Sequence, residues 1–331
     1  MGKGTAKVAR GAITIRKELT FQSVMLNYGL YIAMAATFAT FAIINDRFLS
    51  INNIVNVFEQ AAYYLVCAVG ITFVLVSGNN DMSVGSQVAF SSVIATIFLA
   101  RGGSIPLSMG MMLLFALIIG FCNGLFVVII GLPPFIGTIA TGYVVRGIVA
   151  NMTKQETQFG LPAAYTNFAW TKTLGLSNLT WIAIAITLLG IYILRCTSFG
   201  RKVYACGGNA RAAEVMGINV KRTKIICYII SALSAAIAAM MLMSRLGAAR
   251  SGTAETLHTE CVAAAVIGGT SLKGGQGSVL GTLLGVFFIA MIRNGLNSQG
   301  VNAYWQLVFT GGITLLGAIL DSYKSRANAQ N

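Results

Sequence analysis

A succession of long apolar stretches constrains this chain more than any other feature. The stretches alternate with short polar segments and cover residues 27–45, 54–76, 86–100, 106–130, 135–151, 179–195, 225–243, 261–272, 278–292 and 304–320. A helix needs about 20 apolar residues to cross the hydrocarbon core of a bilayer. Only 10% of the 331 residues are charged, whereas soluble domains carry about 25% charged residues. We therefore predict an all-α, polytopic membrane protein, in preference to a large soluble helical core.

Several of these stretches are too short to cross a membrane as straight, perpendicular helices. Glycine-rich polar segments interrupt them at residues 78–85 and 268–277. Broken helices of this kind occur where the backbone lines a cavity or is buried in protein. Gly277, Gly281 and Gly285 also recur every four residues, which leaves one helix face bare and favours close packing on a neighbour. We predict about ten transmembrane helices, some of them short or discontinuous.

Basic residues are concentrated in the polar segments between the apolar stretches. The net charge is +14, and Lys or Arg residues cluster within the first 17 residues and again between residues 195 and 224. Cytoplasmic loops of membrane proteins carry such an excess of basic residues. An even number of crossings with both termini inside the cell is the simplest topology. The expected parts are a cytoplasmic N-terminal segment (1–26), a transmembrane domain (27–321) with a cytoplasmic loop (196–224) and an external loop (152–178), and a cytoplasmic C-terminal tail (322–331).

The residue inventory argues against catalysis by this chain. His258 is the only histidine, the six cysteines are scattered without a C-x-x-C pair, and no G-x-x-x-x-G-K-[ST] sequence occurs. These absences argue against a histidine-based metal cluster and against a P-loop for ATP. The basic segments also lack the interleaved aromatic residues that a nucleic-acid groove needs. We expect no enzyme activity, metal, cofactor or nucleic-acid partner for this chain itself.

Acidic residues in or near the apolar stretches are few. Glu59, Asp81 and Glu260 are the candidates, and all three lie near predicted helix ends or breaks. Proton-driven transporters carry acids or histidines within their spans. Three acidic residues at helix ends are few for a proton relay, so transport against a gradient would need an energy source outside the chain.

The sequence SGNNDMSVG, residues 77–85, places an acid between two apolar stretches. Asp81 can cap a helix over residues 82–100, because a carboxylate accepts hydrogen bonds from the free N–H groups at a helix start. In a second interpretation, the break lines a transport pathway and Asp81 meets a substrate hydroxyl or a gating partner. The two interpretations are compatible.

The basic segment 199–224 contains the signals of a short helix. Asn209 is a favourable N-cap, residues 210–216 are helix formers, and Gly217 can take the left-handed conformation that ends a helix. These signals predict a helix of about two turns, roughly 10 Å long. We interpret it as a docking element for a cytoplasmic partner. The alternative is an ordinary loop helix.

Four sequence blocks, taken in order, resemble the permease subunits of ribose- and galactose-type ATP-binding-cassette (ABC) sugar importers. They are SGNNDMSVGS, GLPPFIGTIAT, FGRKVYACGGNARAAEVMGINVKR, and ECVAAAVIGGTSLKGGQGSVLGTLLG followed by RNGLNSQGVNAYWQ. The resemblance covers about residues 50–323. The chain departs from the family pattern at Asn79 and Asn80, where Gly-Ile commonly precedes the Asp, and at Glu260, where Asp is usual.

The resemblance implies a translocation pathway between two permease chains, as a homodimer or a heterodimer in the bacterial cytoplasmic membrane. A separate two-cassette ATPase, which holds the ATP and Mg²⁺, would grip the helix within residues 209–217, here called the coupling helix. A periplasmic or lipid-anchored sugar-binding protein would deliver the substrate. The implied coupling residues are Asn209, Ala212, Ala213, Glu214 and Gly217. The implied pathway or helix-break residues are Asn79, Asn80, Asp81, Ser83, Gly85, Phe135, Thr138, Glu260, Gly268, Gly269 and Thr270.

The same resemblance makes a monosaccharide such as ribose or galactose the expected substrate. Permeases of this type also carry nucleosides, autoinducer-type furanosyl compounds or branched-chain amino acids, and these stay open as alternatives. Two further alternatives are a secondary transporter, which would work without an ATPase, and a membrane receptor that transports nothing.

Overall fold

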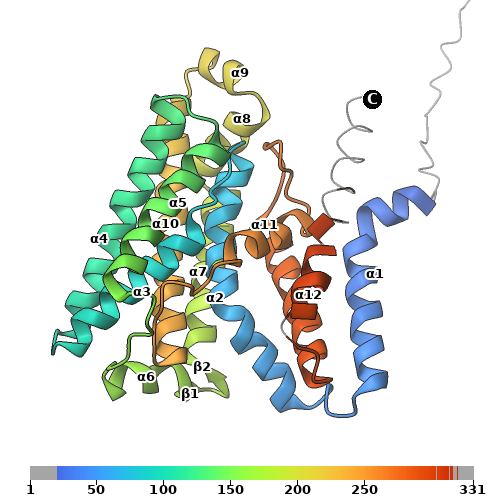
Figure 1. The fold of residues 1–331 in the computed structure, drawn as a ribbon. Coiled ribbons are helices and arrows are strands. Elements are labelled where there is room, and N and C mark those ends of the chain that lie inside the picture. Colours follow the sequence, from blue (N-terminus) through green and yellow to red (C-terminus); the bar gives the residue numbers. More distant parts are fainter. Residues whose placement is uncertain (1–20, 303, 313, 316–318, 320–331) are drawn as a thin grey trace, which may run out of the picture.

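The chain forms a bundle of helices (Figure 1). The computed structural model describes residues 21–302, 304–312, 314–315 and 319. The helices are α1 (Phe21–Ile44), α2 (Ile51–Val76), α3 (Val84–Ala100), α4 (Ile105–Gly124) with its π-helical continuation η1 (Leu125–Ile129), α5 (Pro134–Thr153), α6 (Ala163–Trp170), α7 (Asn178–Cys196), α8 (Ser198–Gly208), α9 (Ala210–Val215), α10 (Val220–Leu246), α11 (Leu257–Ile267) and α12 (Val279–Ser298). Two short antiparallel strands, β1 (Lys172–Thr173) and β2 (Leu176–Ser177), form a small hairpin.

The apolar stretches predict the helices well. Each predicted stretch from residue 27 to residue 292 overlaps one helix. Residues 304–312 are helical too, and the end of the last predicted stretch lies outside the described residues. Within the described part, six helices are long and apolar enough to cross a membrane, namely α2, α4 with η1, α5, α7, α10 and α12. The chain is therefore a mostly helical, multi-pass membrane protein, with the hairpin as a small exception to the all-α prediction.

The two longest connecting regions lie at opposite ends of the bundle. Figure 1 shows α8 and α9 at one end and α6 with the β1–β2 hairpin at the other. Residues 196–224 and 152–178, which we predict to face opposite sides of the membrane, therefore lie at opposite ends of the bundle. The helices α6 and α8 and the hairpin were not predicted. The expected N-terminal segment (1–26) overlaps the start of α1 at Phe21. Its residues 1–20 and the expected C-terminal tail (322–331) lie outside the described residues.

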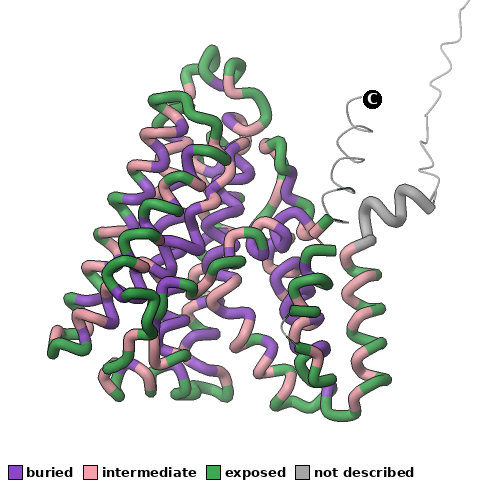
Figure 2. The backbone as a smooth tube through the Cα atoms, viewed as in Figure 1, coloured by how far each residue is buried: buried purple, intermediate pink, exposed green. Residues whose placement is uncertain are grey.

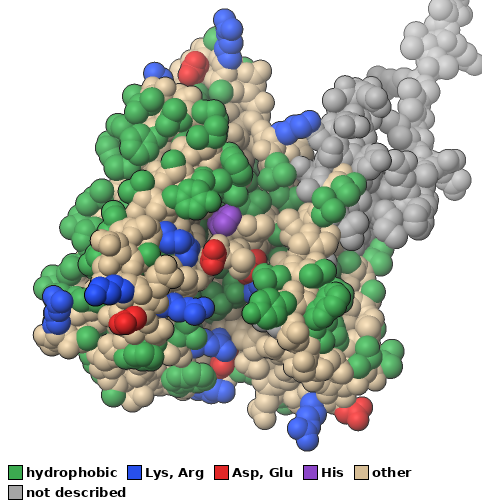
Figure 3. Space-filling model, viewed as in Figure 1, with side chains coloured by type: hydrophobic (Ala, Val, Ile, Leu, Met, Phe, Trp, Pro, Cys, Tyr) green, Lys and Arg blue, Asp and Glu red, His purple; other side chains and the backbone are tan. Residues whose placement is uncertain are grey.

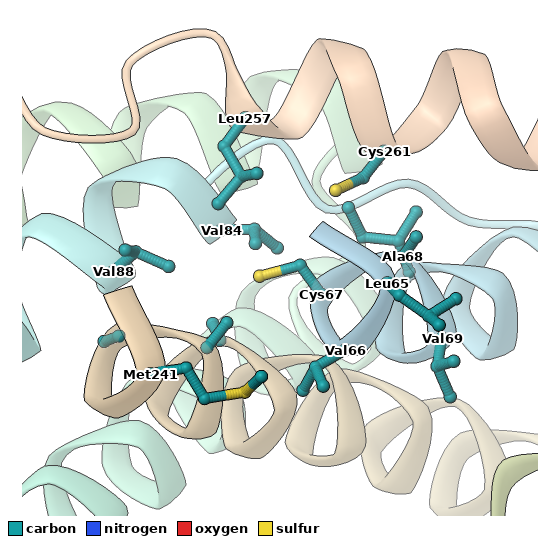
Figure 4. Close-up of a cluster of buried hydrophobic side chains, with 14 of the residues drawn as sticks. Leu65, Val66, Cys67, Ala68, Val69, Val84, Val88, Met241, Leu257 and Cys261 are labelled. Atoms are coloured by element: carbon teal, nitrogen blue, oxygen red, sulfur yellow. The ribbon is translucent and has the colours of Figure 1, made fainter. Parts of the chain in front are cut away.

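Helices α2 and α10 form the centre of the bundle. Residues 65–76 of α2 are buried without interruption, and α10 packs against α2, α3 and α4. Figure 2 shows the buried residues concentrated along these central helices. Figure 4 shows how side chains from several helices meet there, among them Cys67, Met241 and Cys261. Lipid chains are as apolar as leucine, so this close packing, more than escape from water, holds the helices together.

Two glycines let neighbouring helices approach α10 closely. A Cβ added at Gly70 of α2 would lie 2.7 Å from Ser234 Cβ, and one added at Gly120 of α4 would lie 2.9 Å from the Tyr228 carbonyl oxygen. Both contacts are shorter than a methyl group tolerates. Small residues at helix interfaces are typical of membrane bundles, because they bring the backbones into van der Waals contact.

Gly281 and Gly285 of the predicted glycine repeat have the predicted effect, whereas Gly277 lies before α12 begins at Val279. A Cβ at Gly281 would lie 2.0 Å from the Gly268 carbonyl oxygen, and one at Gly285 would lie 1.9 Å from the Ala264 carbonyl oxygen. Ala264 belongs to α11 and Gly268 ends that helix. The bare face of α12 therefore packs on the backbone of α11, as the sequence predicts.

Hydrophobic side chains form several patches on the outer surface of the bundle, as Figure 3 shows for one face. Large apolar residues are exposed on α4, α5 and α7, including Leu114, Tyr143 and Leu188. Contiguous apolar surface of this kind marks a membrane or protein interface. It suits a chain that is surrounded by lipid and by other membrane chains.

We predict that Gly120→Val destabilises the protein by about 1–3 kcal/mol, because the added side chain overfills the α4–α10 contact. The matched control is Gly110→Val on the same helix, where an added Cβ meets no atom within 4 Å. Thermal melting of the purified protein in detergent measures both. Equal melting temperatures for the two variants would contradict the close α4–α10 packing.

Candidate functional site

The predicted coupling helix is present as α9, at one end of the bundle (Figure 1). The Asn209 side-chain oxygen accepts a hydrogen bond from the Ala212 N–H at 3.0 Å, as an N-cap does. Gly217 has a φ of +80°, and the N–H of Ile218 donates to the Ala213 carbonyl at 3.0 Å. The cap and the left-handed glycine are the ones predicted from the sequence.

One face of α9 packs on the protein and the other is exposed. Ala213 is buried with Cys206 and Val220, so it anchors the helix to α8 and α10. Val215 and Met216 are 84% and 81% exposed. Two large apolar side chains are therefore exposed at the C-terminal end of a short, well-capped helix. Of the predicted coupling residues, Ala212 and Glu214 lie on the exposed part and Ala213 does not.

Helix α8 and the start of α10 were missed by the sequence prediction, although their caps are visible in it. The Thr197 hydroxyl accepts from the Gly200 N–H at 3.2 Å, and the Asn219 side chain accepts from the Arg222 N–H at 2.9 Å. These are N-caps of α8 and α10. A search for Ser, Thr or Asn caps on both sides of α9 could have found them.

The break between α2 and α3 is held by Asp81, which is fully buried. One carboxylate oxygen, Oδ1, accepts from the Ser83 N–H at 3.0 Å and from the Ser83 hydroxyl. The other, Oδ2, accepts from the Ser231 hydroxyl of α10 at 2.8 Å. Asp81 therefore satisfies a free N–H just before α3 begins at Val84 and ties the break to α10.

Neighbouring side chains complete this polar network. The Ser83 hydroxyl accepts from the Gln87 amide at 2.7 Å and from the Asn123 amide at 2.8 Å. The Thr138 hydroxyl accepts from the Met82 N–H at 3.0 Å. A buried backbone group without water must find such a partner inside the protein. The network thus contains Asp81, Ser83 and Thr138 from the predicted set, and adds residues of α3 and α4 that the sequence did not indicate.

Three further predicted residues, Asn79, Asn80 and Gly85, lie at this break. The Asn80 carbonyl accepts from the Tyr228 hydroxyl at 3.0 Å, which gives the break a second tie to α10. A Cβ at Gly85 would lie 2.3 Å from the Ala254 carbonyl oxygen, so the loop before α11 rests on the first turn of α3. Asn79 is nearly buried as well. Helix α3 has Ser83 as its N-cap and no side-chain cap hydrogen bond, so Asp81 binds the N–H of the residue before the helix and does not cap the first turn as the sequence predicted.

The second break follows α11 and ends that helix through its backbone. The Gly269 N–H donates to the Val266 carbonyl and the Thr270 N–H to the Ala265 carbonyl, each at 2.9 Å. Gly269 has a φ of +89°, the conformation that glycine adopts past a helix end. Gly268 and Thr270 lie at this end too, and Thr270 is fully buried.

The loop after this second break reaches the first break and α8. The Gly275 N–H donates to the Val76 carbonyl at the end of α2 at 2.9 Å. A Cβ at Gly207 of α8 would lie 1.8 Å from that same carbonyl oxygen, and one at Gly274 would lie 2.5 Å from the Gly78 Cα. We call these four residues, Gly78, Gly207, Gly274 and Gly275, the glycine junction. It joins both breaks to the segment that carries α9.

The remaining predicted residues, Glu260 and Phe135, lie apart from this junction. Glu260 is buried on α11 and forms a salt bridge with Arg293 of α12. Phe135 is 55% exposed on the outside of α5, whereas Thr138 on the same helix is buried. Among the described residues, no group of three or more His, Cys, Asp or Glu side chains could hold a metal ion.

Comparison with known proteins identifies the family. The profile described as branched-chain amino acid transport system / permease component matches residues 53–318. The chain belongs to this permease family. The match includes both breaks, the glycine junction and α9.

Curated relatives of the permease cover nearly its whole length. The ribose import permease protein of Bacillus subtilis is 35% identical over 318 residues, which is 94% of this chain and 98% of the relative. The xylose transport system permease protein of Escherichia coli is 32% identical, with 91% of this chain and 93% of the relative covered. The autoinducer 2 import system permease protein of Salmonella typhi is 30% identical, with 90% and 86% covered. No solved structure gives a significant match to the permease.

We predict that Asp81→Ala destabilises the permease by about 1–3 kcal/mol, because it leaves buried donors of Ser83 and Ser231 without an acceptor. Asp81→Asn should be milder, since it keeps one acceptor oxygen. Asp46→Ala removes an exposed acid and is the control. Thermal melting measures stability, and an uptake assay measures transport. Loss of transport in a stable Asp81→Asn permease would show that the charge acts beyond capping.

We also predict that Gly207→Ala destabilises the permease by more than about 1 kcal/mol, because the new methyl group must displace backbone atoms of the glycine junction. Gly208→Ala is the matched control, since an added Cβ there meets no atom within 4 Å. Melting temperature and limited proteolysis of the purified permease report the difference. Equal behaviour of the two variants would rule out tight packing at the junction.

Proposed function

We propose that this chain is the membrane permease subunit of an ABC importer that takes up a monosaccharide such as ribose or xylose. The observation that carries the proposal is its similarity, over nine-tenths of the chain, to import permeases for these two sugars. The chain would form the translocation pathway, and a separate subunit would bind ATP and Mg²⁺ and hydrolyse the ATP.

The proposed assembly follows from the two ends of the bundle. A cytoplasmic two-cassette ATPase would bind the coupling helix, where Val215 and Met216 are exposed. A binding protein would deliver the sugar at the opposite end, near α6 and the hairpin. A second permease chain, identical or related, would complete the pathway. Ten crossings in the bacterial cytoplasmic membrane, with both termini inside, complete this arrangement.

A second candidate is import of a different small molecule by the same machinery. The family profile is described by branched-chain amino acid transport, and one relative is an autoinducer 2 import permease. Uptake assays separate these substrates. The importer, reconstituted in liposomes with the ATPase and the binding protein encoded beside it, should take up labelled D-ribose or D-xylose and not L-leucine. Uptake without ATP would instead indicate a secondary transporter.

We predict that the double variant Val215→Asp, Met216→Asp weakens binding of the ATPase at least about tenfold, because buried apolar anchors dominate such interfaces. Leu174→Asp is the matched control, since Leu174 is 87% exposed at the opposite end of the bundle. Co-purification with a tagged permease measures binding. If the double variant retains the ATPase as well as the control does, α9 is not the docking helix.

A further inference from the structure

A cavity of about 250 Å³ lies among α2, α10, α11 and α12. It is lined by the C-terminal end of α10, and α10 starts directly after α9, so the cavity lies in the half of the bundle away from the coupling helix. Its polar lining comes from Gln60, Tyr64, Arg245, Glu260, Arg293 and Asn297. Asp81 and the residues of the glycine junction are not part of this cavity lining.

A buried ion pair forms one wall of this cavity. Glu260 is 4% exposed, and its Oε1 accepts from the Arg293 guanidinium and, at 2.6 Å, from the Thr256 hydroxyl. Arg293 also donates to the Tyr64 hydroxyl and lies 5.1 Å from the centre of the Tyr64 ring. Three helices therefore contribute to one polar group, and its two charges neutralise each other.

The pair retains spare hydrogen-bonding capacity. Among the described residues, neither Oε2 of Glu260 nor Nε of Arg293 has a hydrogen-bond partner, although both atoms are buried. Buried polar atoms without a partner are rare in native proteins. One is an acceptor and the other a donor, and both belong to side chains that line the cavity.

A hydroxyl group matches this capacity, since it can donate to a carboxylate and accept from a guanidinium. The charges of Glu260 and Arg293 compensate each other, so this pair offers a ligand hydrogen bonds without a net charge. Arg245, whose guanidinium donates to the Glu59 carbonyl, adds one positive charge elsewhere in the lining. The rings of Tyr63 and Tyr64, whose centres are 4.2 Å apart, add flat apolar surface for the C–H face of a small ring. Gln60 offers an amide group to further hydroxyls, and so does the NH2 group of Asn297, whose Oδ1 already accepts from Gln306.

We propose that this cavity is a binding subsite for a neutral polyhydroxyl ligand, a monosaccharide, within the permease itself. The proposal rests on the function proposed above and deepens it, because it gives the sugar a place among α2, α11 and α12. Glu260 and Arg293 would bind ring hydroxyls, and Tyr64 would orient the guanidinium.

The experiment titrates D-ribose, D-xylose and L-leucine onto the full-length permease in nanodiscs and records saturation-transfer NMR signals. Glu260→Gln removes the charged acceptor and should weaken sugar binding at least about tenfold, as expected for a lost hydrogen bond to a charged group. Glu59→Gln makes the same chemical change one residue before Gln60, on a side chain outside the cavity lining, and should leave binding unchanged.

Gln60→Ala provides a second variant that keeps the ion pair intact, and it should weaken sugar binding several-fold. If Glu260→Gln does not fold, the sugar affinity of Gln60→Ala decides whether the subsite exists. Unchanged sugar affinity in the decisive variant would overturn the subsite, as would the absence of saturable sugar binding to the wild-type permease.

Uptake by the complete importer in liposomes, measured in parallel, distinguishes the two proposals. Sugar uptake without sugar binding to the permease would overturn the subsite and leave the proposed function standing. Uptake and binding of L-leucine without either sugar would overturn both.

Discussion

Hydrogen bonding of the backbone in a medium without water is the constraint on which this structure depends. Unbroken helices satisfy it internally, but the chain is interrupted between α2 and α3 and again after α11. At the first interruption Asp81 and Thr138 accept the free N–H groups. At the second, the N–H of Gly275 finds the carbonyl of Val76. The interruptions are stable because each lies where another segment supplies a partner.

Helix α10 connects α9, the first break and the cavity. It begins directly after α9, its Tyr228 and Ser231 bind the break between α2 and α3, and its C-terminal end lines the cavity beside the Glu260–Arg293 pair. Glycines at its interfaces with α2 and α4 bring the helix backbones close together. One helix thus runs from α9 past the first break to the cavity.

Local features could be predicted from the sequence, whereas pairings between distant residues could not. The length of the apolar stretches predicted the long helices. Asn209 and Gly217 predicted the bounds of α9, because a helix cap acts on residues only a few positions away. The acid at position 81 pointed to a cap, yet its partner Ser231 lies 150 residues away. Tyr64 and Arg293 are 229 residues apart, and neither had a local signal. Phe135 and Thr138 come from one block, but only the helix geometry shows that one is exposed and the other buried.

The glycine junction has a consequence for how movement passes through the permease. At most protein contacts a small displacement is absorbed when side chains change rotamer. Gly78, Gly207, Gly274 and Gly275 have no side chains, and their contacts are between backbone atoms. A shift of α8 therefore has no soft element to take it up. It must either carry the end of α2 and the loop after α11 with it or break these backbone contacts, so the junction is a stiff linkage between the three segments.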